Sequence, residues 1–326
     1  MFCIVRNFLP VLLLLLAVFA NVTSVQAASI VPDLSTISDS DIRNSAIAFV
    51  STSTTPGLSG AVLDVNTDNQ DSKQWRSSLG FSAEFTIRKH IFNGYWGLAI
   101  VGGSLEDMFS VISDTGDQVK LDVTRDVVGV RGSLGLSFPI NQHFKLRPFL
   151  SLGVSNLRTV TIIDGLTLTD PSGNPSTLTT LDTRADMAST TGTVDAIYSR
   201  WFNDNRLELM AGYNLNYTDS ISGDDSVLNT NAWNQTAMIK VRYSGKTNLV
   251  TDGRLWRWNV YVDHTKFLSF DKASLGYTGL FEIGTGIEWH MNIKPLNWFG
   301  WQSVGINFGV ITSRNVEGYN FGLTAR

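Results

Sequence analysis

The chain has 326 residues, of which 43% are hydrophobic and 17% are charged, and its formal net charge is −4. This apolar content is too high for a disordered polymer, and the acidic balance excludes a typical nucleic-acid binder. A single cysteine, Cys3, cannot form an internal disulfide or a multi-thiolate metal site.

The first 27 residues have the organisation of a secretory signal peptide. Arg6 precedes an apolar run over residues 9–20, and the sequence Val25, Gln26, Ala27 resembles a small-residue cleavage site. Cleavage there would also remove Cys3, so catalysis by a thiol is excluded in the mature chain. The apolar run is shorter than the roughly 20 residues that a membrane-spanning helix needs, and no later stretch reaches that length.

From residue 58 onward, long segments alternate apolar and polar residues with a period of two, which is typical of β-strands with two different faces. In residues 206–217, Leu209 belongs to the apolar face and Asn214 to the polar face. Residues 233–243 and 276–290 repeat the pattern. The chain after the signal peptide is therefore predicted to be all-β.

The length of these segments distinguishes a membrane barrel from a soluble β-protein. Strands of soluble domains average about 5–6 residues. These segments reach about 12 residues, which at a tilt near 40° climb roughly 30 Å and cross the apolar band of an outer membrane. The face rich in Gly, Ser, Thr and Asn suits a water-filled lumen. The pattern predicts a transmembrane antiparallel β-barrel; a secreted β-sandwich, the alternative, fits such long strands poorly.

The trace gives about 12 strands, and an even number is what a closed antiparallel barrel requires. The first strand is expected at residues 56–64 and the last at 316–326. Short turns are predicted at residues 89–93, 139–142, 203–205, 247–252 and 291–297. Longer, more acidic connections are predicted at residues 64–71, 113–117, 164–185, 222–229, 269–274 and 312–315. Pro148 falls inside a strand, where its missing N–H predicts a bulge or a local break.

The alternation of short and long connections also predicts an orientation. Barrels of the outer membrane place their short turns in the periplasm, so both termini are expected there, in the outer membrane of a Gram-negative bacterium. The expected partners are outer-membrane lipid, lipopolysaccharide and, during biogenesis, the barrel-assembly machinery. A monomer is expected, and no nucleic acid.

Aromatic residues collect at both membrane interfaces of such barrels, although they are also enriched in any strand. Beside the short turns lie Trp201, Trp256, Trp258, Trp289 and Trp298. Beside the long connections lie Trp75, Tyr217, Trp233 and Tyr277. This distribution predicts two aromatic girdles.

Residues 28–55 form a leader before the predicted barrel of residues 56–326. A helix is predicted over residues 38–50. Ser38 or Ser40 can cap its N-terminus, and the negative charges of Asp39 and Asp41 are favourable at that end. Apolar residues also recur at helical spacing along this segment. A barrel of about 12 strands is wide enough to hold a helix about 10 Å across. A disordered periplasmic leader is the alternative.

These features together resemble the translocator domain of autotransporters, in particular solitary barrels without a passenger. The resemblance rests on the signal peptide, the helix-forming leader, the strand count and a final strand in which Tyr319, Phe321 and Leu323 alternate. It implies that residues 38–50 lie inside the pore. With only about 30 residues between the signal peptide and the barrel, no passenger is expected. The chain departs from the family pattern in ending on Arg326 instead of an aromatic residue.

Strand parity predicts which charges face the lumen. The basic ones are Arg76, Arg88, Arg131, Lys145, Arg147, Arg206, Lys240, Arg242 and Arg257. The acidic ones are Glu84, Glu208, Asp263, Glu282 and Glu288. The acidic excess is expected in the leader and the outer loops, including Asp68, Asp71, Asp107, Asp114, Asp170, Asp182, Asp224 and Asp225. A net positive lumen suits an anion-preferring pore, or partners for Asp39 and Asp41 of an inserted helix. Charges that simply pair across strands are the plainer alternative.

Catalysis is not expected. His90, His143 and His290 fall at the short-turn end, and only His264, beside Asp263, is placed near the outer rim, within reach of Asp219, Asp224 or Asp225. No serine nucleophile motif accompanies it. Asp224 and Asp225 lack the spaced ligand set of a Ca²⁺ loop, so no metal or cofactor is expected.

The sequence therefore indicates an outer-membrane barrel that acts as a narrow or plugged pore for small solutes. The rival hypotheses are a surface interaction protein that acts through acidic external loops and an embedded hydrolase.

Overall fold

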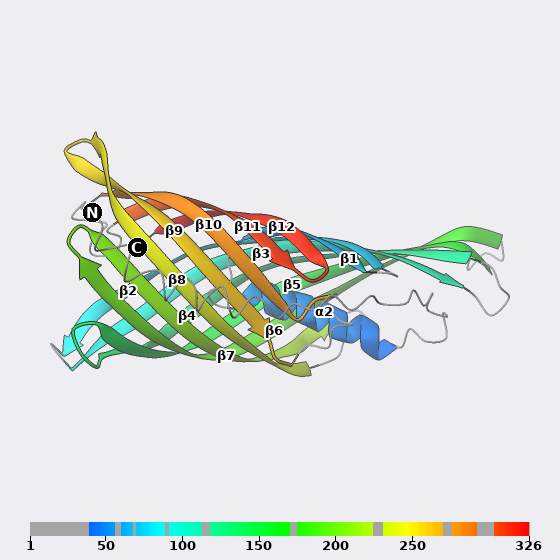
Figure 1. Cartoon of the computed structure of the whole chain (residues 1–326). Coiled ribbons are helices and arrows are strands. Elements are labelled where there is room, and N and C mark those ends of the chain that lie inside the picture. The colour runs from blue at the N-terminus through cyan, green and yellow to red at the C-terminus, as the bar shows by residue number, and fades with distance from the viewer. Residues whose placement is uncertain are drawn as a thin grey trace. The chain divides into compact units, whose positions relative to one another are not determined.

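A computed structural model describes residues 39–55, 60–67, 70–88, 91–112, 118–169, 175–223, 231–269, 276–291 and 303–325. Within these ranges the chain folds into one helix followed by 12 strands, and the strands close into an antiparallel barrel (Figure 1). The predicted fold class and strand number are confirmed. The predicted signal peptide, residues 1–27, lies outside the described residues.

The elements follow one another in simple order. They are α2 (Asp39–Thr54), β1 (Ala61–Thr67), β2 (Gln70–Arg88), β3 (Phe92–Ile112), β4 (Gln118–Pro139), β5 (Phe144–Thr169), β6 (Pro175–Phe202), β7 (Asn205–Gly223), β8 (Asn231–Thr251), β9 (Arg254–Phe267), β10 (Gly279–His290), β11 (Ser303–Ser313) and β12 (Val316–Ala325). Each strand pairs with the next along the chain, and β1 closes the barrel by pairing with both β2 and β12. Val62 illustrates the closure, because it lies opposite Trp75 on one side and Tyr319 on the other.

The two faces of the strands differ as the alternation predicts. Leu209 and Ile239 are exposed on the outer wall, whereas Asn214 retains 1% exposure and Met238 3% on the inner side. Tyr277 does not follow the prediction. It precedes the first residue of β10, retains 3% exposure, and donates a hydrogen bond of 2.7 Å to Gln74 inside the barrel, so it is no part of an outer girdle.

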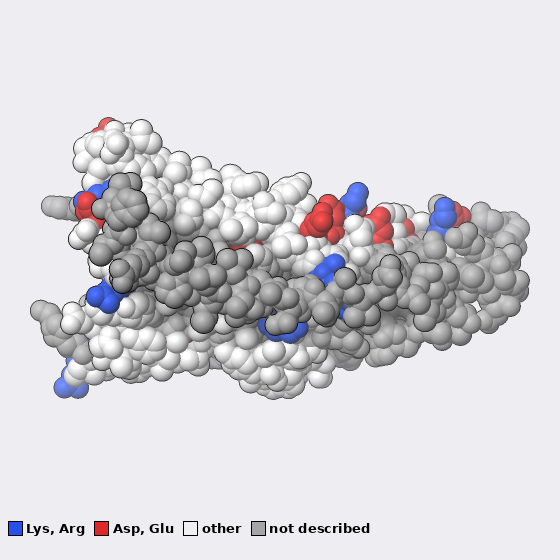
Figure 2. Space-filling view, in the orientation of Figure 1, with Lys and Arg blue, Asp and Glu red and all other residues white. Residues whose placement is uncertain are grey.

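An apolar band encircles the outer wall. On β5 the outward residues run from Leu146 through Leu150 and Leu152 to Val154, and the next outward residues are Asn156 and Arg158. Nine strand residues at about 3.3 Å each and a tilt near 40° rise roughly 23 Å, close to the thickness of an outer-membrane apolar band. In Figure 2 Lys, Arg, Asp and Glu lie at the left end and again from the middle of the view rightward, and the described wall between these groups is largely uncharged.

The two ends of the barrel are different. At the first, which we name the turn end, two-residue turns join β6 to β7 and β8 to β9. Asn203 and Asp252 adopt positive φ there (55° and 51°), as tight hairpins require. At the opposite extension end, β3 to β6 run beyond the other strands (Figure 1). β5 and β6 are the longest, with 26 and 28 residues.

Several predicted connections are wrong. The long connection at residues 164–185 is largely strand, because the Thr-rich sequence pairs across β5 and β6 as far as Thr169 and Pro175. The connection at 64–71 shrinks to two residues between β1 and β2, and the first strand begins at Ala61 instead of residue 56. The turn at 247–252 narrows to Asp252 and Gly253, because β8 continues through a register shift.

Loop length consequently does not alternate as predicted. At the turn end, the connection between His290 and Ser303 exceeds the predicted 291–297, and at the extension end β11 and β12 are joined by two residues. The difference between the two ends lies instead in how far the strands extend.

Pro148 interrupts the ladder locally. β4 and β5 pair at Gly135 with Phe149 and at Phe138 with Leu146, and the two rungs between them, at Pro148 and Arg147, are skipped without a change of register. On its other side Pro148 still lies opposite Val194 of β6. The missing N–H therefore produces a break of the predicted kind and no bulge.

Helix α2 begins one residue after the predicted start and ends at Thr54, four residues beyond the predicted end. Its last turn is Ser51–Thr54, where hydroxyl groups donate to carbonyls one turn earlier, from Thr54 to Val50 (2.9 Å) and from Thr55 to Ser51 (2.6 Å). Sequence periodicity could not reveal this extension, because the added residues are polar.

No helix in the described ranges is long and apolar enough to span a membrane.

Candidate functional site

Helix α2 packs against the inner wall of the barrel toward the extension end. Ala46, Ile47, Phe49 and Val50 are fully buried in a cluster with apolar side chains of the surrounding strands. The strand members of this cluster are Leu105, Val127, Leu157, Ala185 and Met187. A second cluster joins Ala48 to side chains of β1, β9, β10, β11 and β12 and to Tyr277. The helix is thus buried among side chains of the surrounding strands.

Polar contacts fix the C-terminal part of the helix. The Ser51 hydroxyl accepts a hydrogen bond of 2.7 Å from Asn234 and lies 3.2 Å from the Thr218 hydroxyl. Arg131 donates to the backbone carbonyl of Thr54 at the helix C-terminus. A cation at this end interacts favourably with the partial negative charge of the helix dipole. Arg131 therefore serves the helix through its C-terminal carbonyl, whereas Asp39 and Asp41 have side chains outside those described.

The predicted lumen charges lie on the inner face of the strands, with differing exposure. The buried ones are Arg76, Arg242, Arg257, Asp263, Glu282 and Glu288. The half-buried ones are Glu84, Arg131, Lys145, Arg147, Arg206, Glu208 and Lys240. Arg88, at the turn end of β2, is exposed.

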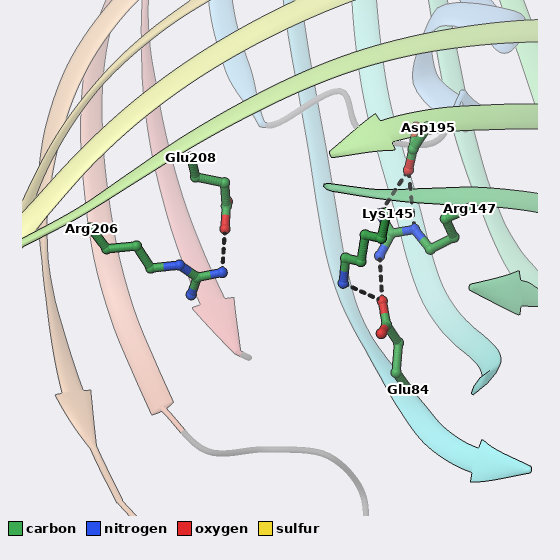
Figure 3. A network of polar contacts seen from close by, with 6 residues as sticks. All are labelled: Glu84, Lys145, Arg147, Asp195, Arg206 and Glu208. Carbon is green, nitrogen blue, oxygen red and sulfur yellow. Dashed lines mark hydrogen bonds and ion pairs between the residues drawn. The ribbon is translucent and has the colours of Figure 1, made fainter. Parts of the chain in front are cut away.

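One wall of the lumen carries a compact charge network (Figure 3). Glu84 accepts a hydrogen bond from Lys145 (2.6 Å) and lies 3.6 Å from a guanidinium nitrogen of Arg147. Arg147 also bonds Asp195 at 2.7 Å, and its Cζ lies 4.5 Å from the centre of the Tyr95 ring. Two carboxylates therefore balance the two cations on this wall.

The wall formed by β7 to β12 carries a longer series of contacts. Arg206 pairs with Glu208 at 2.8 Å, Arg242 pairs with Glu288, and Lys240 lies 3.3 Å from Asp263. Further along, Glu282 accepts hydrogen bonds from Tyr261 (2.6 Å) and Asn320 (2.7 Å). Figure 3 shows Arg206 and Glu208 projecting into the space opposite the Glu84 network. Most of these charges pair across strands, as the plainer interpretation expects.

Sequence reasoning misplaced one acid and missed two lumen residues. Asp107 is not an outer-loop residue: it retains 1% exposure on the inner face, pairs with Arg125, and accepts a hydrogen bond of 2.6 Å from Ser72. Arg125 and Asp195 were absent from the predicted lumen set. Parity could have found all three, because Arg125 lies an even number of residues from Arg131.

Of the other acids predicted in the outer loops, only two lie among the described residues. Asp71 is exposed at the extension end, and Asp182 pairs with Arg158 at 2.7 Å on the outer face of the β5–β6 extension. The remaining ones, Asp68, Asp114, Asp170, Asp224 and Asp225, lie outside the described residues, as does Trp298 of the predicted girdle.

The aromatic girdle at the turn end also differs in one member. Trp256 and Trp289 stack on the outer wall with ring centres 6.3 Å apart. Trp201, by contrast, shares the inward parity of Asp195 and Ile197 and stands at the mouth of the lumen, where its side chain is 55% exposed.

The histidine candidate for catalysis does not assemble a site. His264 is exposed on the outer face, opposite Ile239 and Phe281, whereas its neighbour Asp263 points into the lumen. Successive residues of a strand face opposite sides, so the two side chains do not meet. Of the other histidines, His143 and His290 lie at the turn end, and His90 is not among the described residues. Across the described ranges, no three His, Cys, Asp or Glu residues are grouped closely enough to hold a metal ion.

Described residues of the inner wall line cavities in the lumen. One of about 160 Å³ lies at the turn end and is lined by residues that include Trp201, Arg206, Arg242 and Arg257. Another, of about 100 Å³, lies nearer the helix and is lined by residues that include Tyr261 and Asn320. Arg242 borders both. The chemistry available here is the binding of charged or polar solutes by preorganised side chains.

Comparisons with known proteins bear on the fold. No family model matches the sequence, and no curated protein matches it significantly. The β domain of the Bordetella autotransporter BrkA is similar to this chain, with a TM-score of 0.52 and 12% identity, over 81% of this chain and 94% of that one. The transport unit of the autotransporter AIDA-I from Escherichia coli is similar with a TM-score of 0.46 and 12% identity, over 88% of this chain and 98% of that one. The translocator domain of the autotransporter NalP from Neisseria meningitidis is similar with a TM-score of 0.42 and 12% identity, over 91% of this chain and 98% of that one. The similarity to the BrkA β domain shows that the chain has the fold of an autotransporter β domain.

Proposed function

We propose that the protein is a plugged pore of the outer membrane of a Gram-negative bacterium, in which helix α2 restricts the passage of small solutes. The observation that carries this proposal is the burial of residues 46–55 inside the ring of strands, held by Ser51 and by Arg131. No catalytic step is part of the proposal.

The dimensions support a restricted lumen. A barrel of 12 strands is wider than the 8-stranded kind that side chains fill and narrower than an open porin of 16 or more strands. A helix about 10 Å across takes up much of such a space. The cavities below α2 leave room for water and small solutes between the helix and the turn end.

The proposal includes an orientation. The signal peptide would direct the chain to the periplasm and be cleaved after Ala27. The turn end would remain in the periplasm with the C-terminus. The extended strands β3 to β6 would then stand above the outer leaflet among lipopolysaccharide, and the barrel-assembly machinery would insert the monomer from the periplasm.

Conductance in planar bilayers tests the plug. The mature chain should give small or rare current steps, and a variant without residues 28–55 should give larger ones, because the helix no longer occupies the lumen. The substitution Arg131→Gln, which removes the contact to the Thr54 carbonyl, should give intermediate behaviour. Absence of current from both the mature chain and the deletion variant would refute the pore, and equal currents would refute the plug.

A second candidate function rests on the β5–β6 extension. The outward faces of its two strands carry a polar ladder in which Arg158 pairs with Asp182, and Asp186 accepts hydrogen bonds from Asn156 (2.9 Å) and Ser222 (2.8 Å). Such an ordered polar surface supports binding of an external partner. Shortening the hairpin between Thr159 and Thr183 should abolish binding to whole-cell surfaces without changing conductance; unchanged binding would refute this function.

A further inference from the structure

The cavity at the turn end has more basic than acidic side chains in its lining. Three guanidinium groups border it, from Arg206 on β7, Arg242 on β8 and Arg257 on β9. They meet because their strands are neighbours and all three face inward. Arg242 retains 5% exposure and Arg257 6%. The cavity of about 160 Å³ is far larger than the roughly 10–15 Å³ that one water molecule needs.

The carboxylates on the cavity wall are fewer than the guanidiniums. Glu208 pairs with Arg206 at 2.8 Å and Glu288 pairs with Arg242. Arg257 has no described carboxylate within 4.0 Å; it donates instead to the backbone carbonyls of Asp204 (2.9 Å) and Ser244 (3.3 Å). The lining therefore retains one positive charge in excess, on a guanidinium with 6% exposure.

Trp201 holds two of the guanidiniums near each other. The Cζ atoms of Arg257 and Arg206 lie 4.9 and 5.8 Å from the centre of the same indole ring. The buried Nε–H of Arg206 donates to no described group. Like charges held together around an open space, with a donor left unused, form a preorganised receptor for a negative group.

Neutral donors complete the wall. The imidazole of His290 and the hydroxyl of Ser303 border the same cavity, from the end of β10 and the start of β11. The opposite wall shows the contrast, because Arg147 there is shared between Glu84 and Asp195 and carries no excess charge. Only an anion with several acceptor oxygens can engage the guanidiniums and the neutral donors together.

We infer that the turn-end cavity binds a small oxyanion, a phosphate or a carboxylate, through Arg257, Arg206 and Arg242. This inference rests on the proposed function, which it deepens by naming the class of solute. The exposed indole of Trp201 places the site at the turn-end mouth, so that the anion enters there and meets α2 only after passing the arginines.

Binding is tested on the full mature chain in detergent by isothermal titration calorimetry, with inorganic phosphate and acetate as separate titrants and chloride at equal ionic strength as the reference. Phosphate or acetate should bind more tightly than chloride, and Arg257→Gln should weaken that binding roughly tenfold or more, because a charge-assisted hydrogen bond is lost. The matched control Lys145→Gln removes one lumen cation from the opposite wall and should leave the affinity within about twofold.

A second measurement does not depend on a variant. Phosphate should raise the temperature at which the unmodified barrel loses its fast migration in unheated gels, and chloride at the same ionic strength should not. Equal affinities for oxyanions and chloride, or equal losses in Arg257→Gln and Lys145→Gln, would overturn the inference. Because calorimetry needs no current, binding without conductance contradicts the pore alone, and conductance without binding contradicts the oxyanion site alone.

Discussion

The direction of a single side chain decides what a charged residue does in this barrel. Arg125 and Asp107 retain 2% and 1% exposure and pair with each other inside the lumen next to the helix-packing cluster. The same residue types on the outward face, such as Arg158 and Asp182, lie in solvent beyond the apolar band. A shift of one residue along either strand would exchange these environments, because side chains alternate between the faces.

The buried pair gives a prediction about stability. Arg125→Met removes the ion pair with the buried Asp107 carboxylate and should lower the free energy of unfolding by about 3–5 kcal/mol. The double variant Arg125→Met with Asp107→Asn also removes the buried negative charge and should recover most of that loss. Urea unfolding in phospholipid vesicles, followed by tryptophan fluorescence, measures both. A double variant no more stable than the single one would show that the carboxylate is not isolated by the first substitution.

Among the elements, helix α2 depends most on its surroundings. It spans 16 residues and ends in a polar run of Ser and Thr, so in isolation it would be marginal in water. Inside the barrel its apolar residues are buried in two clusters of strand side chains, and the carbonyl of Thr54 accepts a hydrogen bond from Arg131. The contacts, more than helix propensity, therefore determine where it begins and ends.

Protection of the helix can be measured with a single thiol. In a Cys3→Ser background, Ser53→Cys introduces a thiol at a position with 6% exposure beside Gly103, and it should react with a polymer-linked maleimide only after heat unfolding. Ser269→Cys, at an exposed position, should react in the folded protein. Adding Arg131→Gln should speed the reaction at residue 53. Equal labelling rates at 53 and 269 in the folded barrel would contradict the buried helix.

The outer wall of the barrel is apolar, as contact with lipid requires. About 23 Å of apolar side chains separate the turn end from the polar residues of the extension end, and β1 closes the ring by its pairs with β2 and β12. Closure leaves no strand edge unpaired at membrane depth over the paired residues, which a hydrocarbon environment requires.

The apolar band predicts that the same substitution lowers stability by unequal amounts on the two faces. Ile239→Arg places a charge on the outer wall and should lower the free energy of unfolding by about 2–4 kcal/mol near the membrane midplane. Met210→Arg, one rung away on β7 but facing the lumen, should cost much less, because the new charge reaches water. Vesicle unfolding and gel mobility with and without boiling report both; equal losses would mean that the faces are misassigned.

Much of the fold was predictable from the sequence for a simple reason. Parity of apolar residues over strands such as 206–217 reports the lipid-facing side directly, since lipid tolerates few polar groups. The candidate site was less predictable. The acidic type of Asp107 favours an outer loop and the aromatic type of Tyr277 favours a girdle, whereas their partners Arg125 and Gln74 lie inside the barrel. Residue type does not reveal such partners, which depend on the pairing of distant strands.

Local alternation and chain length are enough to predict the fold class, the strand number and the inner or outer direction of most strand residues. The pairing of charges, the ends of the strands and the position of α2 become apparent only in the folded barrel. Those properties depend on which residues of distant strands face each other: Arg131 meets Thr54 across the lumen, and Arg206 and Arg257 share Trp201 only because the barrel closes.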